Sequence, residues 1–158
     1  MNAPSIVKSS RKIPGVLVAG ALATGLFASA GLGSAPTANA TCASFFGIGN
    51  SVDCTSTLFS IAVAIGDGAV AHADGLLGAA VVVGANSSAT TASGSILNFA
   101  TSLFGDANVV AAQGPIANWA TNIGGSDNAV TTQGSLWNTA TNILGSGNTI
   151  SPQGGYAT

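Results

Sequence analysis

Basic residues are nearly absent from this chain, and glutamate is missing altogether. The only cations are Lys8, Arg11 and Lys12, so residues 41–158 carry five aspartates and no positive charge, a net charge of −5. A surface without cations cannot neutralise phosphates or release their counterions. We therefore expect no nucleic-acid partner, and anionic lipid headgroups are equally unfavourable partners.

Residue types that carry catalysis are also scarce. His72 is the only histidine. It could act as a base oriented by Asp74, but no G-x-S-x-G motif supplies a nucleophile. The glycine-rich corners lack the GK[ST] of a phosphate loop, and the aspartates do not recur in one column as stacked calcium sites require. We expect no enzymatic activity, no metal site and no soluble cofactor. A hydrolase that depends on His72 is the alternative.

The N-terminus has the organisation of a secretory signal. The three basic residues precede an apolar run over residues 16–32, and Ala38-Asn39-Ala40 supplies the small residues of a cleavage site. We predict a signal peptide over residues 1–40, cleaved after Ala40, and a secreted or cell-surface protein. An uncleaved anchor would need roughly 20 apolar residues. Lipid attachment at Cys42 is disfavoured because Thr41 replaces the expected small residue.

The only two cysteines, Cys42 and Cys54, flank a turn-rich stretch over residues 47–50. Export implies an oxidising compartment, so we predict a disulfide between them. Closing a loop of this size contributes about 3 kcal/mol to stability. A two-thiolate metal site is the alternative, but the sequence offers it no further ligands.

A 20-residue repeat dominates residues 95–154. Its columns of identical residues are Gly105, Gly125 and Gly145, then Asn108, Asn128 and Asn148, then Gln113, Gln133 and Gln153. A unit of this length is too short to bury a core alone, so its apolar face must be covered by neighbouring repeats. The period therefore predicts a stack of coils.

Residues 41–94 contain less regular versions of the same unit. They begin near Gly47, Gly66 and Ala85, at a spacing slightly shorter than that of the later repeats. We expect roughly six coils from residue 41 onwards, followed by a short tail over residues 155–158.

Alternation within each unit predicts strands. Large residues alternate with small or polar ones in three aligned segments, at 96–103, 116–123 and 136–143. Leu136, Ala140 and Ile143 also fit a helical spacing, but the alternation of residues 59–65 is typical of a strand. A shorter second strand follows in each unit, as at residues 128–133. The predicted fold class is all-β, a β-solenoid of strand–turn–strand coils.

Stacking places like side chains directly above one another. Asn98, Asn118 and Asn138 should form one amide ladder, and the Gln113 column should form another. We interpret both ladders as structural.

One strand face carries aromatic residues and threonine. It consists of Phe99, Thr101, Trp119, Thr121, Trp137 and Thr141. If this face points outward, it is a flat, uncharged surface suited to sugars or apolar partners. If it points inward, it is the core, and the usual burial of aromatic side chains favours that interpretation.

The last coil bears on self-association. An open end of a stack offers unpaired backbone groups to another molecule. Pro152 lacks an N–H and falls in the last predicted strand, where it would act as an edge cap. This favours a capped monomer, whereas a fibre-forming subunit would leave the edge free.

The motif Gly-x-x-Asn, followed five residues later by Gln, resembles the repeat of curli subunits, the secreted proteins that assemble into bacterial surface amyloid. The resemblance covers residues 95–154 and, more loosely, 47–94. The chain is also similar to other low-charge exported bacterial repeat proteins, including adhesin β-solenoids. The resemblance implies a cross-β or solenoid stack at the cell surface and transfers no active site.

Together these features predict an exported, non-enzymatic structural or adhesive component of the cell surface, able to self-associate or to bind a surface or glycan partner. A membrane-inserting β-strand protein or pore is the alternative, because strands of about nine residues match the bilayer. Threonine ladders also allow an ice-binding role.

Overall fold

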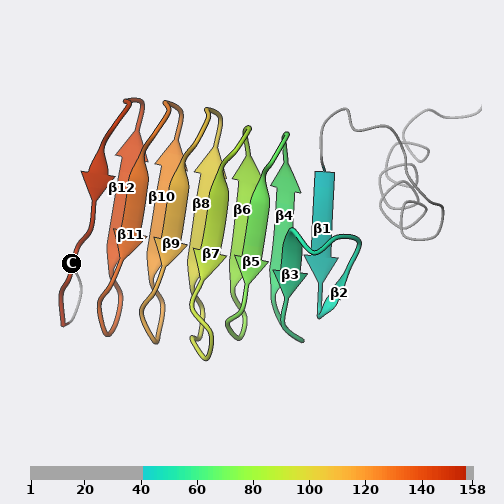
Figure 1. Cartoon of the computed structure of the whole chain (residues 1–158). Coiled ribbons are helices and arrows are strands. Elements are labelled where there is room, and N and C mark those ends of the chain that lie inside the picture. Colours follow the sequence, from blue (N-terminus) through green and yellow to red (C-terminus); the bar gives the residue numbers. More distant parts are fainter. Residues whose placement is uncertain (1–40, 156–158) are drawn as a thin grey trace, which may run out of the picture. The chain divides into compact units, whose positions relative to one another are not determined.

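The structure, a computed structural model, describes residues 41–155. The predicted signal peptide and its cleavage site, together with residues 156–158 of the predicted tail, lie outside the described residues. The described part is all-β, a solenoid in which successive coils stack side by side (Figure 1). The predicted fold class is confirmed.

Two sheets form the walls of the coil. Sheet A contains, in spatial order, β12 (Thr139–Ile143), β10 (Trp119–Ile123), β8 (Phe99–Leu103), β6 (Ala79–Val83), β4 (Ile61–Ile65), β1 (Thr41–Phe45) and β2 (Ile48–Gly49). Sheet B contains β13 (Thr149–Ile150), β11 (Ala129–Thr132), β9 (Val109–Ala112), β7 (Ser88–Thr91), β5 (Val70–Ala73) and β3 (Cys54–Ser56). Consecutive strands alternate between the sheets from β3 onwards, so each coil contributes one strand to each wall.

The register follows the sequence period. Phe99 pairs with Trp119, and Trp119 pairs with Thr139, so equivalent positions of successive repeats lie side by side. Ile61 pairs with Ala79, which makes the coil between them slightly shorter than the later ones. All of these ladders are parallel, and the helical alternative for residues 136–143 is wrong.

The first strand of each coil is shorter than predicted. The expected strand over residues 96–103 is divided: Ile96 forms an isolated bridge, and β8 begins only at Phe99. Leu97 lies between them with a φ of 59°, and Leu77, Ala117 and Trp137 repeat this left-handed conformation. Because an extended strand cannot include such a residue, the longest strands of the described part contain five residues.

The expected first coil is instead a cap. β1 runs antiparallel to β4, and β2 folds back antiparallel on β1. The disulfide between Cys42 and Cys54 is present, with a Cα–Cα distance of 5.6 Å, and it links β1 of sheet A to β3 of sheet B. The predicted first coil, beginning near Gly47, is therefore absent, and the solenoid has about five turns and not six. The turn between β1 and β2 reverses the direction of the chain, and the disulfide links β1 to β3, so residues 41–53 form a hairpin cap in place of a coil.

Small side chains fill the interior. Ala62, Ala80, Ala100, Ala120 and Ala140 form one inward column, each at most 1 % exposed. Sheet B contributes a facing column of Ala71, Ala89, Val110 and Val130, all fully buried. Only small and medium-sized residues line this space, so the large aliphatic and aromatic side chains of the same strands lie outside.

One corner of the coil requires glycine. A Cβ added to Gly105 would lie 1.9 Å from the carbonyl oxygen of Gly125, and one added to Gly125 would lie 1.7 Å from that of Gly145. No side chain tolerates such an approach, so this corner fixes how closely successive coils stack.

Candidate interaction surfaces

The amide ladders predicted from the sequence are present. The Asn118 side-chain amide lies 3.4 Å from Asn98 Oδ1, and Asn138 Nδ2 donates to Asn118 Oδ1 at 2.9 Å. All three side chains are fully buried. Backbone N–H groups add to the ladder, as in the bond from Asn118 N to Asn98 Oδ1 at 2.9 Å. These asparagines hold coils together and are not available to a ligand.

The glutamine ladder is exposed. Gln133 Nε2 donates to Gln113 Oε1, and Gln153 Nε2 donates to Gln133 Oε1, each at 3.2 Å. Solvent competes for these amides, so the ladder contributes little to stability compared with the buried one.

The aromatic strand face points outward, which overturns the interpretation of this face as core. Trp119 is 53 % exposed, Phe99, Thr101 and Thr121 are half-buried, and Thr141 is exposed. Phe99 and Trp119 form an edge-to-face pair with ring centroids 5.6 Å apart. The interior beneath them is occupied by alanine and asparagine, which leaves no volume for an aromatic ring.

Trp137 belongs to a different column. The residue that pairs with Trp119 is Thr139, whereas Trp137 lies in the preceding corner with a φ of 57°. Its side chain is 68 % exposed and borders the strand face. The six predicted residues therefore occupy one side of the coil, with Trp137 at its margin.

Outward side chains of sheet A form a continuous surface, which we call the apolar face. Four of its members are threonines and the others are apolar: Ile61, Val63, Ile65, Ala79, Val81, Val83, Phe99, Thr101, Leu103, Trp119, Thr121, Ile123, Thr139, Thr141 and Ile143. None of them is charged. Only the C-terminal part of this face was predicted from the sequence. Its aliphatic part alternates with alanine in residues 61–65, and that difference in side-chain volume marks the outward side.

The outward face of sheet B differs in chemistry. One of its outward columns is largely polar and consists of Thr55, His72, Thr90, Ala111 and Thr131. The other consists of small and medium-sized residues, namely Val70, Ser88, Val109, Ala129 and Thr149. All five aspartates lie outside the strands, in corners of the coil. The aspartates therefore lie around both sheets, and sheet A, which carries the larger apolar side chains, offers the broader apolar surface.

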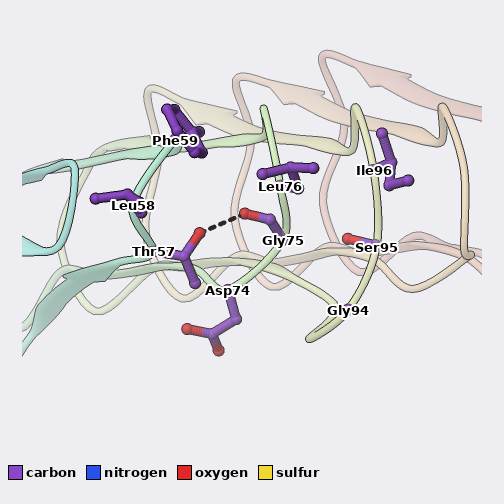
Figure 2. Close-up of a pocket in the computed structure, with 9 residues that line it drawn as sticks. All are labelled: Thr57, Leu58, Phe59, Asp74, Gly75, Leu76, Gly94, Ser95 and Ile96. Atoms are coloured by element: carbon purple, nitrogen blue, oxygen red, sulfur yellow. Dashed lines mark hydrogen bonds between the residues drawn. The ribbon is translucent and has the colours of Figure 1, made fainter.

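An open cleft of about 440 Å³ lies along the corner segments that connect β3 to β4, β5 to β6 and β7 to β8 (Figure 2). It is lined by Thr57, Leu58, Phe59, Asp74, Gly75, Leu76, Gly94, Ser95 and Ile96. Thr57 Oγ1 donates to the Gly75 carbonyl at 2.5 Å, and the Asp74 carboxylate points away from Leu76 and Phe59. The cleft is mainly apolar, and its hydroxyl at Thr57 is already bonded within the protein.

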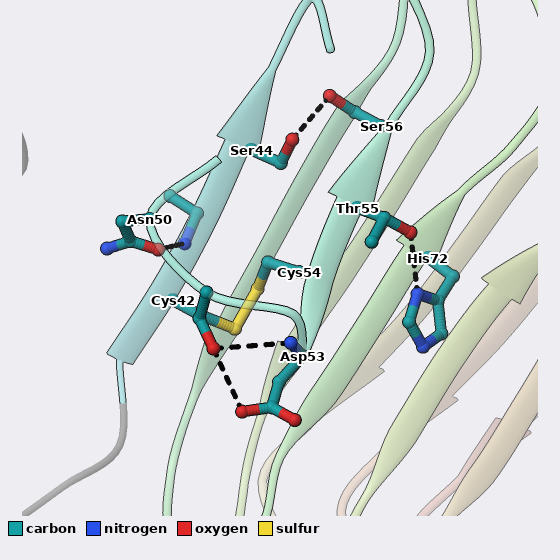
Figure 3. The surroundings of a disulfide bond; sticks show 10 residues. Cys42, Ser44, Asn50, Asp53, Cys54, Thr55, Ser56 and His72 are labelled. Carbon is teal, nitrogen blue, oxygen red and sulfur yellow. Dashed lines mark hydrogen bonds between the residues drawn. A yellow bond between two sulfur atoms is a disulfide. The ribbon is translucent and has the colours of Figure 1, made fainter. Parts of the chain in front are cut away.

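In the described residues, the hydrogen-bond partner of His72 is Thr55 and not Asp74. His72 Nδ1 lies 2.7 Å from Thr55 Oγ1, on the outward side of sheet B (Figure 3). No hydrogen bond or ion pair joins Asp74 to His72 in the described residues. The same view shows the disulfide between the first strands. Within residues 41–155, no group of three or more potential metal-ligating side chains occurs.

Pro152 lies two residues beyond β13, and the prediction that it falls within the last strand is wrong. Its carbonyl accepts a hydrogen bond from Gln133 N at 3.1 Å. In a parallel ladder, a residue directs its N–H and C=O to the same neighbouring strand. The N–H that Pro152 lacks would therefore face β11, inside the stack. This placement accounts for the shortness of β13 and gives no support to a role as an edge cap.

Compared with known proteins, the chain matches no protein-family model, no curated protein and no solved structure. In the described part of the chain, no helix is long and apolar enough to cross a membrane. Function must therefore be inferred from the surfaces of the coil.

Proposed function

We propose that this protein is an exported, non-enzymatic component of the cell surface that adheres to an uncharged, apolar partner through the apolar face. The observation that carries the proposal is the chemistry of this face. Fifteen outward side chains on five strands include no charged residue, and Trp119 is 53 % exposed. Soluble proteins seldom leave such a surface uncovered without a use for it.

The size of the face supports a contact function. Five strands of five residues span about 20 Å across the stack and 17 Å along the strands. This corresponds to an area on the order of 350 Å², and the corner row of Leu76, Ile96 and Ile116 enlarges it. The largest apolar patch on a typical monomer is of this order and is often functional.

Charge placement supports an apolar partner over an anionic one. The five aspartates lie in the corners, and residues 41–158 contain no lysine or arginine. Approach to an anionic surface would be repelled and would gain no ion pair. An apolar surface can instead cover sheet A without desolvating a carboxylate.

The alternative of membrane-inserting strands receives less support. It relied on strands of about nine residues, whereas the longest described strands have five residues, or roughly 17 Å of extended chain. This is shorter than a spanning strand requires.

A matched pair of substitutions tests the adhesive face. Thr121 of β10 and Thr131 of β11 are both half-buried. Thr121 lies on the outward side of sheet A, and Thr131 lies on the outward side of sheet B. We expect Thr121→Asp to reduce retention on alkyl-coated beads at least about tenfold, because docking would bury a carboxylate. Thr131→Asp should change retention less than twofold on the same basis. Circular dichroism verifies that both variants fold.

Equal losses in the two variants, or retention that is unchanged in Thr121→Asp, would contradict the proposal. Retention on polysaccharide beads that depends on Trp119 would instead favour a glycan partner. Export is tested separately by mass spectrometry of the culture medium, where the processed chain should begin at Thr41. A cell-bound or unprocessed chain would contradict that part.

A further inference from the structure

The two ends of the solenoid differ in how many backbone N–H and C=O groups of the terminal strand of sheet A are hydrogen-bonded within the chain. At the N-terminal end, β2 pairs with Ser44 and Phe45 of β1. The neighbouring residue Ala43 donates its N–H to Asn50 Oδ1 at 2.8 Å and accepts from Asn50 N at 3.1 Å. The outer edge of β1 is therefore occupied by its own hairpin, and only the two-residue β2 remains beyond it.

The C-terminal end presents a full-length edge strand. β12 ends sheet A, and its five residues pair only with β10 among residues 41–155. Trp119 N donates to Asn138 O, and Leu144 N donates to Ile123 O, each at 2.8 Å. In a parallel sheet, alternate residues of a strand direct their N–H and C=O groups toward opposite neighbouring strands. Asn138 and Leu144 face β10, so the N–H and C=O groups of Thr139, Thr141 and Ile143 face the open side.

The last coil also keeps residue types that, in earlier coils, form hydrogen bonds to the next coil. Asn108 Nδ2 donates to the Gly125 carbonyl at 2.9 Å, and Asn128 Nδ2 donates to the Gly145 carbonyl at 2.7 Å. The corresponding Asn148 donates within its own coil, to Asn142 Oδ1 at 3.2 Å. Capping repeats of solenoids usually depart from the repeat sequence. Here the N-terminal end departs from it, and the C-terminal end keeps its Gly and Asn columns.

We propose that a second copy of this chain docks on the C-terminal end, with β12 of the two copies paired antiparallel about a two-fold axis. A head-to-tail contact would need the N-terminal end as its partner, and that end offers the two residues of β2 in sheet A and the three residues of β3 in sheet B. Neither strand matches the five residues of β12, whereas a second β12 matches them in full, which gives a closed dimer and no fibre. The inference rests on the edges and does not depend on the proposed adhesive function.

The dimer has two geometric consequences. Thr141, at the centre of β12, faces the same residue of the other copy at a Cα distance of about 5.5 Å. The two sheets A join into one sheet, so the two apolar faces become continuous on one side of the dimer. One end of a coil is a small interface, and we expect a dissociation constant on the order of micromolar.

Cysteine cross-linking tests the arrangement, using the full chain expressed with residues 1–40 so that export proceeds normally. Thr141→Cys should give a covalent dimer with a short bis-maleimide linker at high protein concentration. Thr101→Cys is the matched control, because it lies in the same outward column two coils from the open end. The two copies of residue 101 would be about 24 Å apart, so this variant should dimerise without being cross-linked by the short linker.

Several outcomes would overturn the proposal. Cross-linking of both variants would indicate dimers that stack through the apolar face. A ladder of higher oligomers in native mass spectrometry would indicate head-to-tail assembly. A single monomeric species for Thr141→Cys at high concentration would show that the open edge of β12 does not pair with a second copy.

Proline substitution provides an independent measurement by analytical ultracentrifugation. The N–H of Thr141 faces the open edge, so Thr141→Pro should weaken the dimer at least about tenfold while the melting temperature of the monomer is retained. Thr121→Pro is the control inside the sheet, where loss of the N–H should lower the melting temperature. A dimer that survives Thr141→Pro with unchanged affinity contradicts β12 pairing.

Discussion

The two halves of the coil are filled with different chemistry although they share one fold. In residues 41–94 the interior is mainly aliphatic, with a few buried serines and Thr91, and one inward column is occupied by Ala64 and Val82. In residues 95–154 the same column continues as Ser102, Asn122 and Asn142. The N-terminal half is closed by a disulfide and an antiparallel cap, and the C-terminal half has amide ladders and an open end.

The two halves show two ways to stabilise a thin stack. Aliphatic burial is non-directional and tolerates coils of different lengths, as the pairings of Ile61 with Ala79 and of Ala79 with Phe99 show. Amide ladders are directional, because each donor must meet the acceptor of the next coil. This requirement accounts for the strict register of the C-terminal half.

The polar interior has a cost. Ser102 Oγ, Asn122 Nδ2 and Thr132 Oγ1 are buried without a hydrogen-bond partner in the described structure. An unsatisfied buried polar group costs about 1–3 kcal/mol. All three lie in the C-terminal half, so register there is specified at the expense of stability, whereas the N-terminal half gains stability from its disulfide.

The largest effect should come from the feature that both halves share, the glycine corner. A Cβ would lie 2.1 Å from a carbonyl oxygen at Gly66 and 1.9 Å at Gly105. We expect Gly66→Ala and Gly105→Ala each to destabilise the fold by on the order of 4 kcal/mol, because whole coils must separate. Gly94→Ala is the control, since its Cβ meets nothing within 4 Å. Only its positive φ is strained there, at about 1 kcal/mol. Urea unfolding measures all three, and similar losses at Gly94 and Gly105 would contradict the close-stacking explanation.

Removing the disulfide should destabilise the N-terminal half more than the C-terminal half. Replacing Cys42 and Cys54 with alanine should lower the unfolding free energy by about 3 kcal/mol. Because coils contact only their neighbours, the loss should be local. Hydrogen exchange should show faster exchange in β1 and β3 and retained protection in β10 and β11. Uniformly faster exchange would mean that the halves unfold as one unit.

The smallest effects should distinguish buried from exposed ladders in the C-terminal half. Asn118→Ala removes the Oδ1 atom that accepts from Asn138 N and Asn138 Nδ2 and leaves a cavity at a fully buried position, so we expect a loss of about 2–3 kcal/mol. Gln133→Ala removes an exposed ladder member and should change stability by no more than about 0.5 kcal/mol. Chemical denaturation of the two variants provides the test. Equal effects would show that burial does not decide the strength of these ladders.

Much of the architecture could be predicted from particular residues. The recurrence of Gly105, Gly125 and Gly145 indicated regular coils, and the asparagine and glutamine columns indicated ladders that the structure contains. The candidate face was predicted less well. Both orientations of Trp119 were left open, and the general preference of aromatic residues favoured the core. The structure instead places inside the alanines that alternate with the large residues of Ile61–Ile65.

By itself, the sequence determined the coil length, the ladder columns and the absence of cations beyond residue 12. These properties depend on local periodicity and composition, which need no knowledge of distant contacts. Only the tertiary structure decided which strand face is inside, how β1 turns back against β4, and which end remains open. Both faces of the strands mix apolar and polar residues, so hydrophobicity could not choose between them. The choice was made by the volume available between two closely packed sheets, where alanine and asparagine fit and tryptophan does not.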